Sequence, residues 1–183
     1  MKLQIVSALS LLLSSATAVP NPIPTAFDVL ALRSASLIHF AQVSASRSSL
    51  FLGLPLSNAT CKGESSGHAT FYIANQELVL YSSEGETQKI FVDRSGMGQG
   101  VIGYVTGSLP LPRYGELKGW SIDTNKNLWF NNQSLVACPN SIDDSWSLWL
   151  DLGLSQPGGN EGCLGIAART LENEEPVSCL YTQ

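Results

Sequence analysis

The strongest constraint on this chain is a two-residue alternation of apolar and polar side chains, which is the period of a β-strand with one buried face. The alternation is clearest in residues 120–151. Trp120 and Ile122 alternate with polar residues, segment 124–127 is a polar turn, and the pattern resumes through Leu128–Phe130. Two alternating runs joined by such a turn predict a β-hairpin.

Apolar runs of the same kind occur along the rest of the chain, and no amphipathic stretch is long enough to predict a principal helix. The predicted strands cover residues 27–32, 37–43, 50–52, 71–73, 78–80, 90–93, 135–138, 146–150 and 163–170. Many short strands separated by turn residues predict an all-β fold in one compact domain.

The order of apolar runs repeats within the chain. Segment 71–93 follows the pattern of segment 120–151, with Phe71 corresponding to Trp120, and Phe27 lies 44 residues before Phe71. Three successive units of similar length would suit a threefold arrangement. We therefore favour a β-trefoil-like fold, with a two-sheet β-sandwich as the alternative.

The beginning of the chain predicts secretion. Lys2 precedes an apolar run at residues 5–13 that is too short to cross a bilayer, and residues 16–18 form an Ala-x-Ala cleavage site. We predict a signal peptide at residues 1–18. A proline-rich arm at 19–26 then precedes a single disulfide-stabilised β domain at 27–183. No GPI signal is recognisable near the C-terminus, so the sequence predicts secretion without a membrane anchor.

Charge and composition exclude several classes of protein. Without Lys2, the chain carries nine basic and fifteen acidic residues, a net charge of −6, and it has no Lys/Arg cluster. Such a surface would repel phosphates, so we expect no nucleic-acid partner. With 44% apolar and only 14% charged residues, the chain is expected to fold rather than remain disordered.

Four cysteines in a secreted chain predict two disulfides. They are Cys61, Cys138, Cys163 and Cys179. Cys163 and Cys179 flank a short segment, so we favour pairing these two and joining Cys61 to Cys138, with the other two connectivities left open. Because no Cys-x-x-Cys occurs and neither histidine has ligand-like spacing, we predict no metal site and no cofactor.

The glycine-rich segment 96–107 has the composition of a phosphate-binding loop, but its surroundings argue against one. No helix-forming segment follows it, and no Gly-Lys-Ser/Thr sequence occurs. A glycine-marked turn followed by a strand is the better interpretation.

No residue pattern identifies a reaction. Gly-x-Ser-x-Gly is absent, His39 lies in a predicted apolar strand, and His68 lies in a predicted loop. Paired carboxylates would suit a glycosidase, although sequence gives no distance between them. The candidates by residue type are Asp93, Asp123, Asp143, Asp144 and Asp151. We predict that the protein is not an enzyme.

The four tryptophans fall within residues 120–149, and tryptophan rings stack well on sugars. Because side chains alternate along a strand, Trp129 is expected on the face opposite to the core-facing Leu128 and Phe130. Trp149 is likewise expected on the face opposite to its apolar neighbours. Trp129 and Trp149 are therefore candidates for an exposed glycan platform, with packing under a second layer as the alternative. Asn58 and Asn132 each begin an Asn-x-Ser/Thr sequon and are candidates for N-glycosylation.

The segment at residues 27–40 and the following 49–53 resemble the mature N-terminus of the PhiA-type fungal cell wall proteins. Segments 136–139 and 179–182 are similar to later landmarks of that family. The resemblance implies a small secreted glycoprotein of the hyphal and spore wall, connected with phialide and conidium development and with members that bind IgE as allergens. The family has no established catalytic residues, so the resemblance assigns none here.

These observations lead to one hypothesis and one alternative. The hypothesis is a non-enzymatic, secreted cell wall glycoprotein that takes part in fungal wall organisation and binds wall polysaccharide, with no nucleic-acid or membrane partner. The alternative is a secreted lectin-like effector that acts on a host or a competitor. The sequence assigns no oligomeric state.

Overall fold

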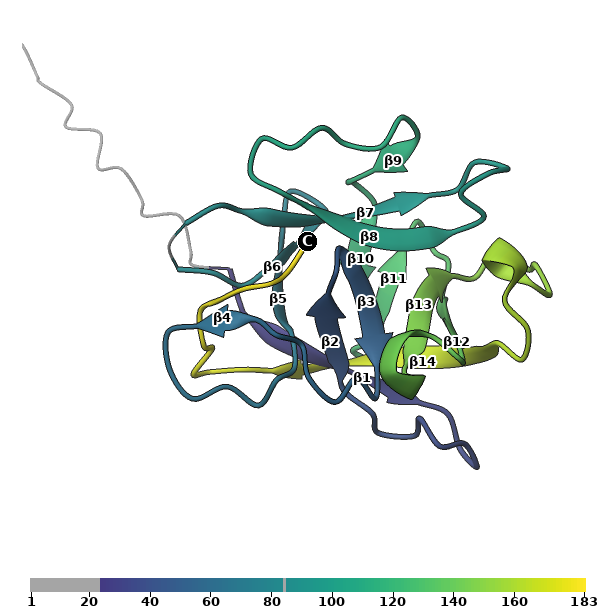
Figure 1. Cartoon of the computed structure of the whole chain (residues 1–183), viewed down its shortest axis with the longest axis horizontal. Helices are drawn as coiled ribbons and strands as arrows, with labels where there is room; N and C mark the ends of the chain where they lie inside the picture. The colour runs from purple at the N-terminus through teal and green to yellow at the C-terminus, as the bar shows by residue number, and fades with distance from the viewer. Residues whose placement is uncertain (1–23, 84) are drawn as a thin grey trace, which may run out of the picture.

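The computed structural model describes residues 24–83 and 85–183 (Figure 1), and within them it contains strands, turns and two short 3₁₀ helices. The all-β prediction is confirmed. The predicted signal peptide at 1–18 and most of the predicted arm at 19–26 lie outside the described residues. In the part of the chain that is described, no helix is long and apolar enough to span a membrane.

Nine antiparallel strands close into a barrel, in the order β3-β8-β7-β6-β5-β1-β14-β12-β13 and back to β3. Their bounds are β1 Phe27–Leu32, β3 Ser49–Leu52, β5 Thr70–Ala74, β6 Glu77–Leu80, β7 Gln88–Asp93, β8 Val101–Thr106, β12 Leu135–Cys138, β13 Trp146–Leu150 and β14 Leu164–Glu172. Closure leaves the ring without free edges.

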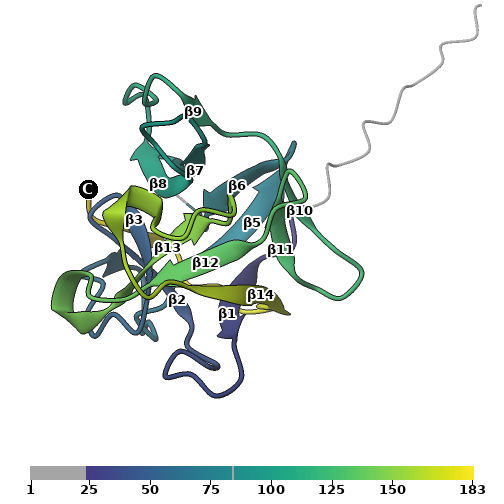
Figure 2. The same cartoon turned by 90° about the vertical axis from the view of Figure 1, so that its right-hand side faces the viewer.

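Six further strands lie beside or across this ring. They are β2 Val43–Ser46 on β3, β9 Gly115–Glu116 on β7, the pair β4 Thr60–Cys61 and β15 Cys179–Leu180, and the hairpin β10 Trp120–Ile122 with β11 Leu128–Phe130. Figure 2 shows this hairpin at one side of the ring of strands. The two 3₁₀ helices, η1 Ile142–Asp144 and η2 Pro157–Gly159, lie in loops.

The alternation in the sequence has the expected structural effect. Along β1 and β7 every second residue is buried, and the buried set faces the barrel interior. The repeat also appears in cross-strand pairs: Phe71 pairs with Leu80, and Trp120 pairs with Phe130. The choice between a trefoil and a sandwich stays a prediction.

Hairpin β10–β11 fills the barrel instead of extending its sheet. Trp120 and Phe130 are almost fully buried, with ring centroids 5.0 Å apart in an edge-to-face arrangement. Trp120 and Leu128 also line an internal void of only about 10 Å³ together with residues of six barrel strands, among them Val29 and Leu148. A ring of nine strands encloses a wide interior, and this hairpin supplies large side chains to fill it.

The predicted strand at residues 37–43 is wrong for most of its length. Residues 34–40 form turns, β2 begins only at Val43, and Leu37 is 95% exposed. Positive φ angles at Ala35 and Phe40 interrupt the extended backbone. Within residues 34–40 only Ile38 belongs to the core, so this run of apolar residues forms a loop that ends before β2.

The predicted disulfide pairing is also wrong: the bridges are Cys61–Cys179 and Cys138–Cys163. Cys61 and Cys179 are directly opposite each other in the β4–β15 pair. Ala137 pairs with Leu164, which places Cys138 and Cys163 at the end of the same ladder. Strand order, rather than sequence separation, decides which cysteines meet.

The segment after β15 is hydrogen-bonded into the barrel. Gln88 is 1% exposed, and its amide group donates to the Tyr181 carbonyl at 2.9 Å while its side-chain oxygen accepts from the Tyr181 N–H at 2.8 Å. Ser48 N–H and the Tyr104 hydroxyl both donate to the Thr182 carbonyl. The Gln88 side chain therefore satisfies both backbone groups of Tyr181, as a neighbouring strand would.

We predict that non-reducing peptide mapping of the secreted protein will recover Cys61 linked to Cys179 and Cys138 linked to Cys163. The loop-closure entropy of the unfolded chain predicts the cost of removing each bridge. Replacing Cys61 and Cys179 by alanine should lower the free energy of unfolding by about 5 kcal/mol, and replacing Cys138 and Cys163 should lower it by about 3.5 kcal/mol. Chemical denaturation of the two double variants measures this difference. A Cys61–Cys138 peptide would contradict the strand pairing.

We expect Gln88→Leu to lower the free energy of unfolding by about 2 kcal/mol or more, because it leaves the Tyr181 N–H and carbonyl buried without partners. Denaturant unfolding measures the effect. Gln183→Leu, the same replacement at an exposed position, is the matched control and should leave stability unchanged. Equal stability of the two variants would show that the segment is held by other contacts.

Candidate functional site

The outer face of hairpin β10–β11 carries the first candidate site. Leu128 and Phe130 point into the barrel and are buried, whereas Trp129 between them points outward and is half-buried. Ser121 is the cross-strand partner of Trp129 on the same face. The hairpin therefore supports Trp129 on a strand that the barrel interior holds in place.

Asp123 fixes the orientation of the Trp129 ring. The indole Nε1–H donates to Asp123 Oδ2 at 2.9 Å, and the backbone N–H of Asn127 donates to Asp123 Oδ1 at 2.8 Å. The hydrogen bond from Asn127, and then that from Trp129, lowers the pKa of Asp123 below its usual value of 3.8. Asp123 consequently stays ionised, and the ring stays held, in a mildly acidic medium.

An open hollow of about 400 Å³ lies over this face, and we call it the Trp129 hollow. Its lining residues are Ser121, Asp123, Trp129 and Asn132. An aromatic face, a carboxylate and a hydroxyl are the groups that recognise a sugar ring, the first by stacking and the others by hydrogen bonds to hydroxyls.

Trp149 lines a second hollow of about 340 Å³ that shares no lining residue with the first. Its indole Nε1–H donates to Ser147 Oγ at 3.0 Å. Gly158 of η2 lies against the ring: a Cβ added there would be 2.3 Å from the nearest ring carbon. The structure therefore does not join the two predicted platform residues in one surface, and it covers part of Trp149.

A polar groove of about 710 Å³ was not anticipated from the sequence. It is lined by Arg94, Ser95, Arg113, Tyr114, Gly115, Glu116, Gln133 and Leu152. Two hydrogen bonds of 2.8 and 2.6 Å join the Arg94 guanidinium to the Glu116 carboxylate, which raises the pKa of Arg94 and lowers that of Glu116. Tyr114 is 52% exposed beneath Arg113. No local motif marks this groove, because it forms where β9 meets four loops that are distant in the sequence.

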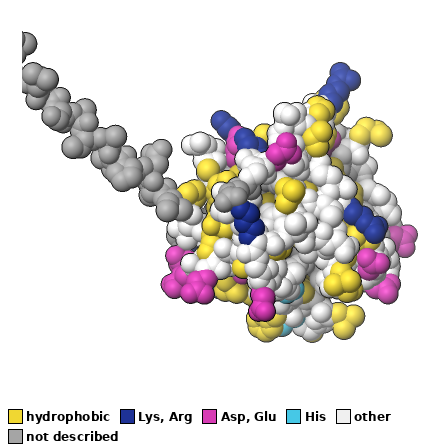
Figure 3. All heavy atoms as spheres, turned by 60° about the vertical axis from the view of Figure 1, so that its left-hand side comes forward, with side chains coloured by type: hydrophobic (Ala, Val, Ile, Leu, Met, Phe, Trp, Pro, Cys, Tyr) yellow, Lys and Arg dark blue, Asp and Glu magenta, His cyan; other side chains and the backbone are white. Residues whose placement is uncertain are grey.

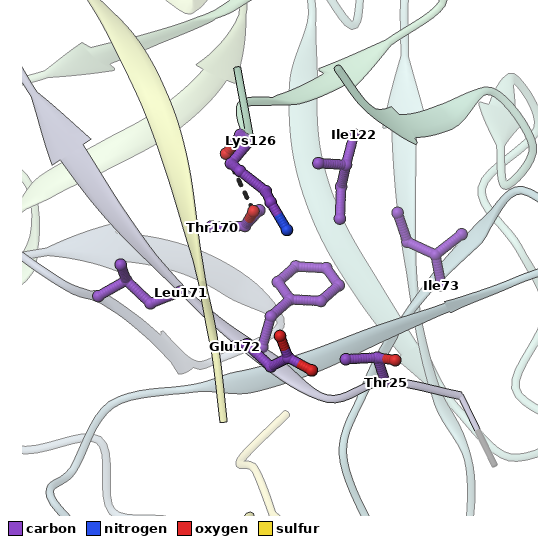
Figure 4. A pocket seen from close by; sticks show the side chains of 8 residues that line it. Thr25, Ile73, Ile122, Lys126, Thr170, Leu171 and Glu172 are labelled. Carbon is purple, nitrogen blue, oxygen red and sulfur yellow. Dashed lines mark hydrogen bonds between the residues drawn. The ribbon is translucent and has the colours of Figure 1, made fainter. Parts of the chain in front are cut away.

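The cavity in Figure 4 has a volume of about 560 Å³, and one of its lining residues is Ile122, which strand alternation places on the hairpin face opposite to Ser121 and Trp129. Phe27, Ile73 and Ile122 form its apolar walls, while Lys126 and Glu172 stand at opposite sides of it. The Thr170 hydroxyl donates to the Lys126 carbonyl at 2.9 Å and ties the turn of the hairpin to β14.

The carboxylates considered for glycosidase chemistry hold local turns. Asp93 accepts from the Ser95 N–H and Asp151 accepts from the Gly153 N–H, each at 2.9 Å. Asp143 and Asp144 lie exposed in η1. Among residues 24–83 and 85–183, no three His, Cys, Asp or Glu side chains are grouped so that they could hold a metal ion.

The two histidines are separate from these hollows. His39 lies in a turn, contrary to the prediction of a strand, and its Nδ1 accepts from the Arg33 N–H at 3.1 Å. His68 lies in a loop, as predicted, 3.4 Å from the Ser44 hydroxyl, and burial lowers its pKa. Figure 3 shows acidic and basic side chains dispersed over one face of the molecule, with apolar side chains among them.

Both sequon asparagines are exposed. Asn58 lies in the loop before β4, and Asn132 lies in the turn between β11 and β12. Each is therefore accessible for an N-glycan on the folded surface. The described surface is that of a disulfide-bonded all-β domain with an aromatic, sugar-compatible hollow and two exposed sequons.

Such a surface defines a class of small secreted domains, and comparison with known proteins places the chain within it. The model of the PhiA-like secreted protein family matches residues 27–182, and the chain belongs to this family. It is similar to cell wall protein phiA of Emericella nidulans, with 51% identity over all of both chains. It is also similar to proteins of that name from Aspergillus fumigatus, with 48% identity over 93% of this chain and 92% of the relative, and from Aspergillus niger, with 45% identity over 94% and 97%.

The chain is therefore a secreted fungal cell wall protein. The names of these relatives describe a wall protein and state no reaction. No solved structure matches the chain.

We expect Gly158→Ala to destabilise the protein more than Gly159→Ala. Both glycines have a positive φ, so each change costs about 1 to 2 kcal/mol of backbone strain. Only at Gly158 does the new methyl group also meet the Trp149 ring, whereas nothing lies within 4 Å at Gly159. Thermal unfolding followed by near-ultraviolet circular dichroism tests this, with a changed tryptophan signal expected in Gly158→Ala alone. Identical spectra and midpoints would contradict the packing described for η2.

Proposed function

We propose that this wall protein is a non-enzymatic glycoprotein, held noncovalently in the fungal wall by binding wall polysaccharide, and that it takes part in wall organisation during conidium and phialide development. The observation that carries the proposal is the Trp129 hollow, in which Asp123 fixes an outward tryptophan ring beside polar groups.

Three features of the hollow support sugar binding. The Trp129 ring is preoriented by the hydrogen bond to Asp123, so little rotamer entropy is lost when a sugar stacks on it. The strand beneath is fixed by the buried Leu128 and Phe130. The hollow is open, so an extended polysaccharide chain can lie across it rather than enter by one end.

A non-enzymatic role is supported by how the carboxylates are used. Asp93, Asp123 and Asp151 each accept hydrogen bonds from backbone N–H groups in their own turns. A retaining or inverting glycosidase needs two carboxyl groups facing each other across the bond to be broken. These three groups each stabilise a turn instead.

Binding of the purified, oxidised mature protein to insoluble chitin, β-glucan and whole wall fractions tests the proposal. We expect saturable binding, and we expect Trp129→Ala to weaken it at least about tenfold, equivalent to about 1.4 kcal/mol. Trp129→Phe should retain part of the affinity because it keeps an aromatic face.

Trp149→Ala is the comparison, since Trp149 lies in a separate hollow and is partly covered. An equal loss of affinity in Trp129→Ala and Trp149→Ala would assign polysaccharide binding to both tryptophans together. No binding by the native protein to any fraction would reject polysaccharide association, and release of reducing sugar would reject the non-enzymatic role. Complementation of a deletion strain with Trp129→Ala then tests whether conidium development depends on the same ring.

A further inference from the structure

Asn132 belongs both to a sequon and to the lining of the Trp129 hollow. It occupies a two-residue turn in which Phe130 and Gln133 exchange both backbone hydrogen bonds, at 3.1 and 2.9 Å. The φ angles of Asn131 and Asn132 are 47° and 63°, as a type I′ turn requires. The turn therefore fixes the direction in which the Asn132 side chain leaves the surface.

The turn places the sequon asparagine next to an aromatic ring. Trp129 precedes Asn132 by three residues and lines the same hollow. A sugar joined to Asn132 Nδ2 is thus held by a covalent bond at the rim of a hollow that already contains a stacking surface. The volume of about 400 Å³ is within the range of pockets that hold small ligands.

We propose that the first N-acetylglucosamine of an N-glycan on Asn132 folds back into the Trp129 hollow and stacks on the indole ring. The sugar's hydroxyl and amide N–H groups donate to the Asp123 carboxylate, and the Ser121 hydroxyl exchanges a hydrogen bond with the sugar. Because the glycan is tethered, its effective concentration at the ring is high and free sugars compete poorly.

This inference rests on the proposal that the protein is an N-glycosylated protein. It adds that the glycan on Asn132 regulates polysaccharide binding. The tethered sugar covers the ring that a wall polysaccharide would use. Protein that carries the Asn132 glycan should therefore bind polysaccharide more weakly at this hollow than protein whose Asn132 is unmodified.

The test uses the full chain secreted from a yeast host, with site occupancy determined by mass spectrometry. Endoglycosidase H then leaves one N-acetylglucosamine at each occupied site, and nuclear magnetic resonance observes the acetyl methyl groups. We expect the methyl at Asn132 to shift upfield through the ring current of Trp129. The shift should vanish in Trp129→Ala and persist in part in Trp129→Phe.

Matched controls come from the third residue of each sequon. Ser134→Ala removes the glycan at Asn132 and should remove the shifted signal, whereas Thr60→Ala removes the glycan at Asn58, which does not line the hollow, and should leave that signal in place. Ser134→Ala should also lower the melting temperature more in the native background than in Trp129→Ala, where only the 3.5 Å hydrogen bond from Ser134 to Asp151 is lost. An unmodified Asn132, an unshifted methyl or additive melting temperatures would each overturn the proposal.

Polysaccharide binding by Ser134→Ala separates the two ideas. Stronger binding than by the glycosylated protein supports control by the tethered sugar, and unchanged binding overturns that control. A shifted methyl in a protein that binds no wall fraction would reject the proposed polysaccharide association while leaving the tethered-sugar site established.

Discussion

The structure depends on filling the inside of a closed ring of strands. Closure satisfies the strand edges with hydrogen bonds, but it also encloses an interior that side chains must occupy at high density. Strands of the ring such as β1 and β7 contribute every second residue to this interior. Hairpin β10–β11 adds Trp120 and Phe130, two of the largest buried side chains, so the core depends on an element outside the barrel sheet.

The same hairpin connects the core to the surface. Because successive residues of a strand face opposite ways, burying Leu128 and Phe130 forces Trp129 outward. The ring position is then set by Asp123, a residue of the hairpin turn. A side chain that would be mobile on a loop is instead held on a rigid strand, as a recognition site requires.

Much of this arrangement could be predicted from sequence, because it follows from local periodicity. The hairpin at 120–130 and the outward direction of Trp129 both come from the two-residue alternation. The disulfide pairing could not be predicted, since it depends on which strands become neighbours when the ring closes. The Arg94–Glu116 groove was missed for the same reason, and 37–43 was misassigned because backbone torsion, not hydrophobicity, breaks that strand.

The pairing of β1 with β14 has a consequence for how the protein is made. Phe27 pairs with Glu172, 145 residues further along the chain, so the ring cannot close until translation has passed that point. The nascent chain therefore remains open while residues 28–171 are being synthesised. The closed barrel that carries the Asn131–Asn132 turn therefore forms only after the sequon at Asn132 has been synthesised.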